Sequence, residues 1–164
     1  EVISHYLRST WLWERVRVQG GAYGGFCVFD SHSGTFGYVS YRDPNVLQTL
    51  DIYDQTADFL ESLELPQEEL EKSIVGTIGS VDAYQLPDAK GFSAMARRLI
   101  NYSDEARQQY RTELLNTTAE DFRAFAGLAR QVAESGSIVV VGAPAAIQAA
   151  DEARGIGFEV TKLI

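Results

Sequence analysis

Apolar side chains recur at helical spacing through residues 2–18. One stripe holds Ile3, Leu7, Trp11 and Val18, and a second holds Val2, Tyr6, Trp13 and Val16. A surface helix carries a single apolar stripe, so two stripes predict a helix that is packed between layers. Gly20 and Gly21 follow and predict its end.

The apolar pattern then becomes that of extended chain. Ala22 to Asp30 is rich in aromatic and branched residues, and Thr35 to Tyr41 is a second run of the same kind. Ser31-His32-Ser33-Gly34 between them has the composition of a turn. These features predict two antiparallel strands joined as a hairpin.

Helical periodicity returns after the predicted hairpin. Asp43-Pro44 is typical of an N-cap and a first-turn proline, and predicts one long helix with apolar positions at Leu47, Leu50, Tyr53, Ala57 and Leu60. Pro66 opens a second helix, whose stripe holds Leu70, Ile74, Ile78 and Val81. Three more amphipathic helices are predicted at about 88–100, at about 104–115 and from Thr118 through Val132. Asp121 is placed for a capping box with Thr118.

The C-terminal segment reads as strand, helix and strand. Ile138-Val139-Val140-Val141 is a branched run, Ala145 to Arg154 is a small-residue helix, and Phe158 to Leu163 is a final short strand. The whole order favours one α+β domain over residues 1–164. We expect a small, largely antiparallel sheet with helices packed mainly on one face.

Composition narrows the function classes. The 164 residues carry a formal charge of −9, which repels nucleic-acid phosphates and attracts cationic partners. No run reaches the roughly 18 apolar residues that span a bilayer, so neither nucleic acid nor membrane is an expected partner. The single Cys27 favours a reducing compartment, either the cytosol or an organelle matrix.

The chemistry-bearing residues do not form a metal or nucleotide motif. His5 and His32 lie far apart, with no spacing that places several ligands around one ion, so no metal site is predicted. Cys27 alternates with apolar residues in a predicted strand, which favours burial over a nucleophilic function. The glycines Gly20, Gly21, Gly24 and Gly25 precede a strand and no Lys-Ser or Lys-Thr follows them, which argues against a phosphate loop.

Three stretches nevertheless resemble one family. Residues 12–26 (LWERVRVQGGAYGGF), 40–45 (SYRDPN) and 76–91 (GTIGSVDAYQLPDAKG) resemble, in the same order, segments of presequence-protease-like members of the pitrilysin/insulinase zinc metallopeptidases. The resemblance covers about the first 100 residues well and the remainder more loosely. It identifies the chain as a C-terminal, fourth domain of such a protein.

The resemblance implies a protease of four homologous domains in two halves that close like a clamshell. A zinc motif, His-x-x-Glu-His, belongs to the first domain and is absent from this chain. Zinc is therefore expected in the N-terminal half of the same chain, which is the expected partner, and the isolated fragment is expected to be inactive. The implied substrates are unfolded or targeting peptides, basic ones among them.

The resemblance also implies which residues act. The family's closing half supplies an arginine and a tyrosine to the active site, and their spacing matches Arg17 and Tyr23. Both side chains can donate hydrogen bonds to the oxygen that becomes negative in the tetrahedral intermediate. Gly21, Ala22, Gly24 and Gly25 are the expected substrate-binding positions, because a substrate strand can lie alongside small residues.

Other interpretations stay open. Arg17 can form an ordinary ion pair with Glu14 of the same helix. Tyr23 can be an ordinary aromatic residue of the strand, with its hydroxyl group hydrogen-bonded to water. The acidic charge can attract basic peptides or only keep the protein soluble. The domain can also be a non-catalytic subunit or a peptide-binding scaffold, and an intact zinc motif in the parent's first half would favour the peptidase.

Overall fold

The computed structural model describes residues 1–162, and these contain one hairpin and nine helical segments. The strands are β1 (Gly24–Asp30) and β2 (Thr35–Tyr41). The helices are α1 (Val2–Ser9), the π-helix η1 (Trp13–Gln19), α2 (Val46–Asp54), α3 (Thr56–Glu61), α4 (Gln67–Val81), α5 (Pro87–Leu99), α6 (Asp104–Leu115), α7 (Ala119–Ser135) and α8 (Pro144–Arg154).

The predicted helix over 2–18 is divided into α1 and η1. The hydroxyl of Thr10 donates a hydrogen bond to the carbonyl of Tyr6 at 2.7 Å, and Thr10 itself leaves the helical region at φ −122°. Such side-chain bonds compete with the helical ladder. Beyond this break the N–H of Gly20 bonds to the carbonyl of Arg15, five residues back, as in a π-helix.

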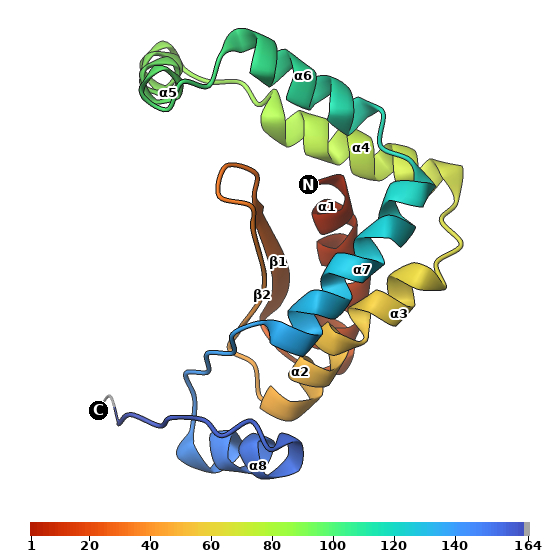
Figure 1. The fold of residues 1–164 in the computed structure, drawn as a ribbon, viewed down its shortest axis with the longest axis vertical. Helices are drawn as coiled ribbons and strands as arrows, with labels where there is room; N and C mark the ends of the chain where they lie inside the picture. Colours follow the sequence, from red (N-terminus) through yellow and green to blue (C-terminus); the bar gives the residue numbers. More distant parts are fainter. Residues whose placement is uncertain (163–164) are drawn as a thin grey trace.

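The hairpin has an inner face toward the helices and an outer face toward solvent. Figure 1 shows α1, α2 and α7 all on one side of β1 and β2. The inner rings of Phe36 and Tyr38 lie 5.2 Å from Phe125 of α7 and 4.7 Å from Tyr53 of α2. This arrangement confirms the predicted α+β class with helices on one face of a small antiparallel sheet.

The outer face of the hairpin is apolar but uncovered. Antiparallel register places Phe26 opposite Val39 and Gly24 opposite Tyr41 on this face. Phe26, Val39 and Tyr41 are each between 41% and 52% exposed. A contiguous apolar face that is exposed to solvent is typical of a surface that binds another molecule.

The main core lies where α1 crosses α3 and α7. Phe122 of α7 is 1% exposed and meets the ring of Tyr6 edge-on at 5.4 Å. Trp11 stacks on Phe59 at 4.5 Å, and its indole N–H donates to the hydroxyl of Thr56 at 3.1 Å. These contacts fix the N-terminal helix beneath the hairpin.

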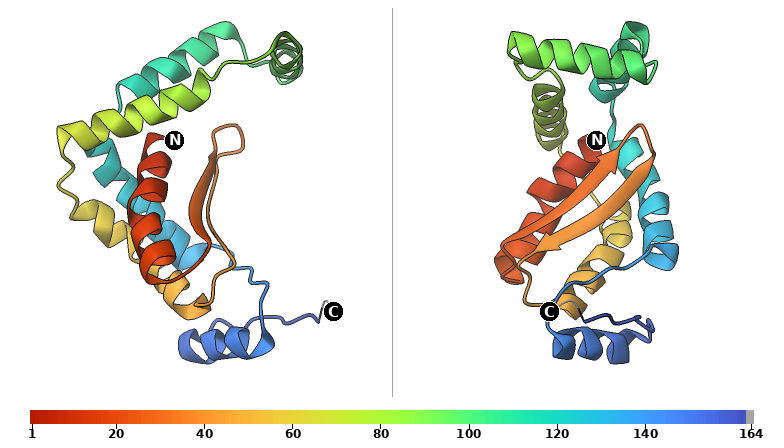
Figure 2. Two further views of the ribbon diagram at one scale, coloured as in Figure 1. Left: turned by 180° about the vertical axis from the view of Figure 1, so that it is seen from behind. Right: turned by 90° about the vertical axis from the view of Figure 1, so that its left-hand side faces the viewer.

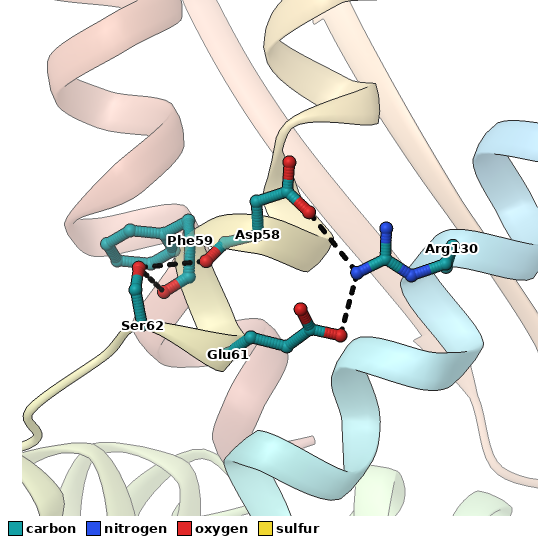
Figure 3. Close-up of polar contacts among 5 residues, drawn as sticks. All are labelled: Asp58, Phe59, Glu61, Ser62 and Arg130. Carbon is teal, nitrogen blue, oxygen red and sulfur yellow. Dashed lines mark hydrogen bonds and ion pairs between the residues drawn. The ribbon is translucent and has the colours of Figure 1, made fainter.

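Ion pairs also join α3 and α7 at the solvent-exposed edge of their interface. Figure 3 shows the guanidinium of Arg130 on α7 between two carboxylates of α3, at 3.2 Å from Asp58 and 2.7 Å from Glu61. The groups are solvent-exposed, so water screens both pairs and they contribute little to stability. Apolar burial, rather than these charges, holds α3 against α7.

Two details of the helical prediction need correction and one is confirmed. The long helix after the hairpin is two helices, α2 and α3, and it begins at Val46 rather than at Pro44. Asp43 lies two residues before the N-cap position, which Asn45 occupies. Its carboxylate accepts hydrogen bonds from the N–H of Asn45 and from the hydroxyl of Thr49. The capping box between Thr118 and Asp121 is present as predicted.

The predicted strand at Ile138–Val141 is wrong, and so is its return to the sheet. Residues 138–141 run without strand pairing, and Val139 is 88% exposed. A groove separates this segment from β2, so their backbones do not form a ladder. Within residues 158–162 there is also no strand, and Leu163 lies outside the described residues. Branched residues favour strands only where a partner edge lies within reach.

The core position of Phe122 gives a stability prediction. Phe122→Ala should lower the free energy of unfolding by about 3–5 kcal/mol, because it removes a buried ring and leaves a cavity. Phe92→Ala is the matched control, since Phe92 is 68% exposed and should change stability by less than about 0.5 kcal/mol. Urea unfolding followed by circular dichroism measures both, and equal losses would contradict this placement of the core.

Candidate functional site

The segment 20–23 connects η1 to β1 and carries three of the six predicted site residues, Gly21, Ala22 and Tyr23. Gly21 adopts φ +76°, a left-handed conformation that glycine enters without strain. The N–H of Ala22 bonds to the carbonyl of Val16 at 3.2 Å, and the N–H of Tyr23 bonds to the carbonyl of Arg42 at 3.3 Å. The amide of Asn45 also donates to the carbonyl of Gly20. This junction is therefore fixed at both ends.

Tyr23 stands at the exposed base of the hairpin. Its side chain is 65% exposed, and its ring meets Tyr41 edge-on at 5.9 Å. The guanidinium of Arg42 lies 5.8 Å from the Tyr23 ring and 5.3 Å from the Tyr41 ring. Two aromatic rings and one cation thus form a cluster that is open to solvent, and we call Tyr23, Tyr41 and Arg42 the hairpin-base cluster.

Arg17 lies on the last turn of η1. Its guanidinium sits over the ring of Trp13 at 4.1 Å, which is cation–π geometry. The suggested ion pair with Glu14 is not formed, because the carboxylate of Glu14 accepts instead from the side chain of Gln19 at 3.0 Å. Both Arg17 and Tyr23 are exposed at the same junction, each held by a different aromatic partner.

The four predicted substrate-binding positions differ in exposure. Gly21 is exposed, whereas Ala22, Gly24 and Gly25 are buried. A Cβ added at Gly25 would lie 2.8 Å from the Cβ of Val16. One at Gly24 would lie 2.4 Å from the ring of Phe26. Packing therefore explains both buried glycines. Gly25 allows the close approach of β1 to η1, and Gly24 allows the ring of Phe26 to lie against the backbone.

Sequence reasoning missed a groove beside the site. It has a volume of about 950 Å³ and lies between β2, α2 and the segment 137–141. Gly21 and Arg42 are among its lining residues, so the groove adjoins the junction described above. Tyr38 and Tyr53 contribute its inner wall, and burial raises the pKa of each phenol to about 12. Its walls come from distant parts of the chain, which no local sequence pattern indicates.

Cys27 is buried on the inner face of the hairpin. Its thiol donates to the carbonyl of Ser4 at 3.2 Å, and burial raises the pKa of this thiol to about 11. Because the thiolate is the nucleophile, a thiol that stays protonated at neutral pH is unsuited to covalent catalysis. The structure thus favours the packing interpretation of Cys27.

The two histidines are used in packing. The ring of His5 lies against Gly76 of α4, where an added Cβ would be 2.6 Å from its Cε1. His32 meets Tyr102 at 5.1 Å, at the hairpin turn. Residues 1–162 bring together no group of three or more His, Cys, Asp or Glu side chains suited to a metal ion. The donor set of this domain therefore does not fit a zinc site.

The close approach of Val16 to Gly25 predicts that a glycine-to-alanine substitution has opposite effects on stability at Gly25 and at Gly127. Gly25→Ala should destabilise the domain by about 1–3 kcal/mol, because the methyl group must displace Val16. Gly127→Ala, in α7 with open space around it, should instead stabilise by up to about 1 kcal/mol through helix propensity. Thermal unfolding of both variants measures this, and a tolerated Gly25→Ala would contradict the packing account.

The buried thiol and phenols predict a loss of stability in alkali. In ordinary surroundings their pKa values are 9.0 for Cys27 and 10.0 for Tyr38 and Tyr53. Since folding raises each pKa, the contribution to stability is complete below pH 9 and is lost as pH rises from 9 to 12. The urea concentration at the unfolding midpoint should therefore decrease as the pH is raised above 9. Between pH 9 and 11 this decrease should be smaller for Cys27→Ala than for the unmodified protein. A midpoint unchanged up to pH 11 would contradict these pKa values.

The fold and site together define a class of domain. A short hairpin covered on one face by helices carries an exposed arginine and tyrosine at its base, and its described residues hold no metal cluster. This is an α+β domain that exposes an arginine and aromatic groups at the base of its hairpin. The chain belongs to the family described as the PreP C-terminal domain, whose model matches residues 1–144.

Three relatives illustrate the similarity. Presequence protease 1, chloroplastic/mitochondrial, of Arabidopsis thaliana is 56% identical over 163 residues, which are 99% of this chain and 15% of that protein. Protein HypA of Clostridium perfringens is 37% identical over 86% of this chain and 14% of that protein. The mitochondrial presequence protease of Xenopus tropicalis is 33% identical over 73% of this chain and 11% of that protein.

The chain therefore spans between 11% and 15% of the length of these relatives. Among the helices of residues 1–162, none has the length and apolar character needed to cross a membrane. Two of the three relatives carry mitochondrial names, one of them also chloroplastic.

Proposed function

We propose that this domain positions peptide substrate and stabilises the transition state for a zinc metalloendopeptidase of the presequence-protease type. The observation that carries the proposal is the exposed pair Arg17 and Tyr23 at the η1–β1 junction of a chain 56% identical to a presequence protease. Zinc is supplied by the N-terminal half of the parent protein, since the donor set of this domain does not fit the metal.

The two side chains suit the charge that develops during peptide hydrolysis. When water adds to a peptide carbonyl, its oxygen becomes negative and needs donors that are already in place. The Tyr23 phenol is held at the hairpin base by a backbone bond to Arg42 and an edge contact with Tyr41. The Arg17 guanidinium is held over Trp13. Such preorganised donors require little movement as the reaction proceeds.

The proposed substrates are unfolded peptides, including basic targeting peptides. The apolar outer face of the hairpin, with Phe26, Val28 and Val39, offers contact to apolar side chains of an extended segment. The net charge of −9 favours cationic peptides over anionic ones. Reduced Cys27 and the mitochondrial relatives support an organelle matrix as the compartment in a eukaryote, and the cytoplasm otherwise.

The experiment is cleavage of a fluorogenic basic peptide by the full-length parent, at equal zinc content and equal folded fraction. Tyr23→Phe should lower kcat by about a hundredfold to a thousandfold, because it removes one hydrogen-bond donor to the developing oxyanion. Tyr41→Phe is the matched control, since Tyr41 is a neighbouring tyrosine of similar exposure. It should change kcat by less than about threefold.

The outcomes separate the peptidase from a scaffold. If Tyr23→Phe cleaves as fast as the unmodified protein, Tyr23 does not contact the reacting oxygen and the catalytic assignment is wrong. If the unmodified parent holds no zinc and cleaves nothing, yet binds basic peptides in a salt-dependent way, the domain belongs to a peptide-binding scaffold instead.

A further inference from the structure

Helix α5 stands apart from the rest of the domain. Figure 2 shows it at the far end of the α4–α6 arm, away from α7 and α8. None of its thirteen residues, all of which the structure describes, is buried. A helix of this length is only marginally stable in water by itself, so it depends on packing against a partner.

The amphipathic pattern of α5 is inverted. Four residues of α5 are half-buried, the small Ala89, Ser93 and Ala96 together with Arg97, and Ser93 accepts a hydrogen bond from Gln85 at 3.2 Å. The large apolar residues point outward instead. Phe92, Met95 and Leu99, at spacings of three and four, are 68%, 53% and 75% exposed.

The apolar stripe extends past both ends of α5. Leu86 before the helix is 61% exposed and Ile100 after it is 58% exposed. Together with Phe92, Met95 and Leu99 they make five large exposed apolar side chains between residues 86 and 100, which we call the α5 stripe. A stripe of this kind is typical of a helix that lies in an apolar groove of a partner.

The net charge of α5 has the opposite sign to that of the chain. Within α5 there are three basic side chains, Lys90, Arg97 and Arg98, and one acidic side chain, Asp88. The chain as a whole has a net charge of −9. The partner of this helix should therefore present an apolar groove bordered by carboxylates.

We propose that the α5 stripe docks into an acidic-rimmed apolar groove on the part of the parent protein that lies outside this chain. The relatives are about seven to nine times as long as the matched segments, so most of the protein surface available to α5 belongs to the same molecule. A covalently joined partner is present at a much higher effective concentration than a second copy or a membrane. This inference does not rest on Arg17 or Tyr23 being catalytic.

The test is site-specific photo-crosslinking in the full-length parent. Phe92→p-benzoylphenylalanine places a photoreactive ring on the α5 stripe with little change in shape. Leu128→p-benzoylphenylalanine is the control, because Leu128 of α7 is 54% exposed but lies outside the stripe. The Phe92 variant should give at least fivefold more crosslink within one molecule than the control, and mass spectrometry should find the linked peptides outside residues 1–164.

Charge reversal tests the acidic rim. Arg98→Glu in the Phe92→p-benzoylphenylalanine background should lower the crosslink yield severalfold. Arg123→Glu on α7 changes the net charge equally and should leave the yield unchanged. Arg123 is exposed and, within residues 1–162, pairs only with Glu120 of its own helix. Equal effects of both reversals would contradict an acidic groove.

Other results would overturn the proposal. Crosslinks between molecules whose yield falls on tenfold dilution would identify a second copy as the partner. Crosslinks to anionic vesicles of phosphatidylserine and phosphatidylcholine, in place of protein, would identify a membrane surface. Equal yields from the two photoreactive variants would show that the stripe has no partner. Adding Tyr23→Phe should leave all crosslink yields unchanged. The crosslinking experiment can therefore contradict the docking of α5 without bearing on the catalytic function of Tyr23, and the reverse holds for the cleavage experiment.

Discussion

The close approach of β1 to η1 governs the geometry of this domain. Val16 is fully buried, and its side chain occupies the space where a Cβ of Gly25 would stand. This contact brings the base of the hairpin against the end of the N-terminal helix, and the left-handed Gly21 lets the chain turn between them. Because core packing transmits small changes of volume, one methyl group here would shift both Arg17 and Tyr23.

The hairpin serves two purposes through its two faces. Its inner face stacks Tyr38 on Tyr53 and buries Cys27, which keeps the thiol and the phenols neutral. Its outer face remains apolar and exposed, with the hairpin-base cluster at one end. A domain that makes its own core with one side of a two-stranded sheet leaves the other side available for a peptide or for the rest of the parent protein.

The periphery of the domain is built for contact rather than for self-sufficiency. Helix α5 buries none of its residues and exposes its large apolar ones, which lowers the stability of an isolated chain and favours a partner. The groove beside β2, with Gly21 and Arg42 in its wall, is a second open surface. These features agree with a segment that forms a small part of the length of its relatives.

The sequence by itself determined the hairpin, the positions of most helices, the α+β class and the family, because helical periodicity, the hairpin turn and the Thr118–Asp121 capping box are local signals. It also placed Arg17 and Tyr23 at one junction through a motif. Tertiary structure decided that segment 138–141 stays unpaired and that Arg42, rather than Arg17, lies beside the Tyr23 ring. These features depend on which distant backbone comes within reach, and a pattern of neighbours along the chain does not encode that distance.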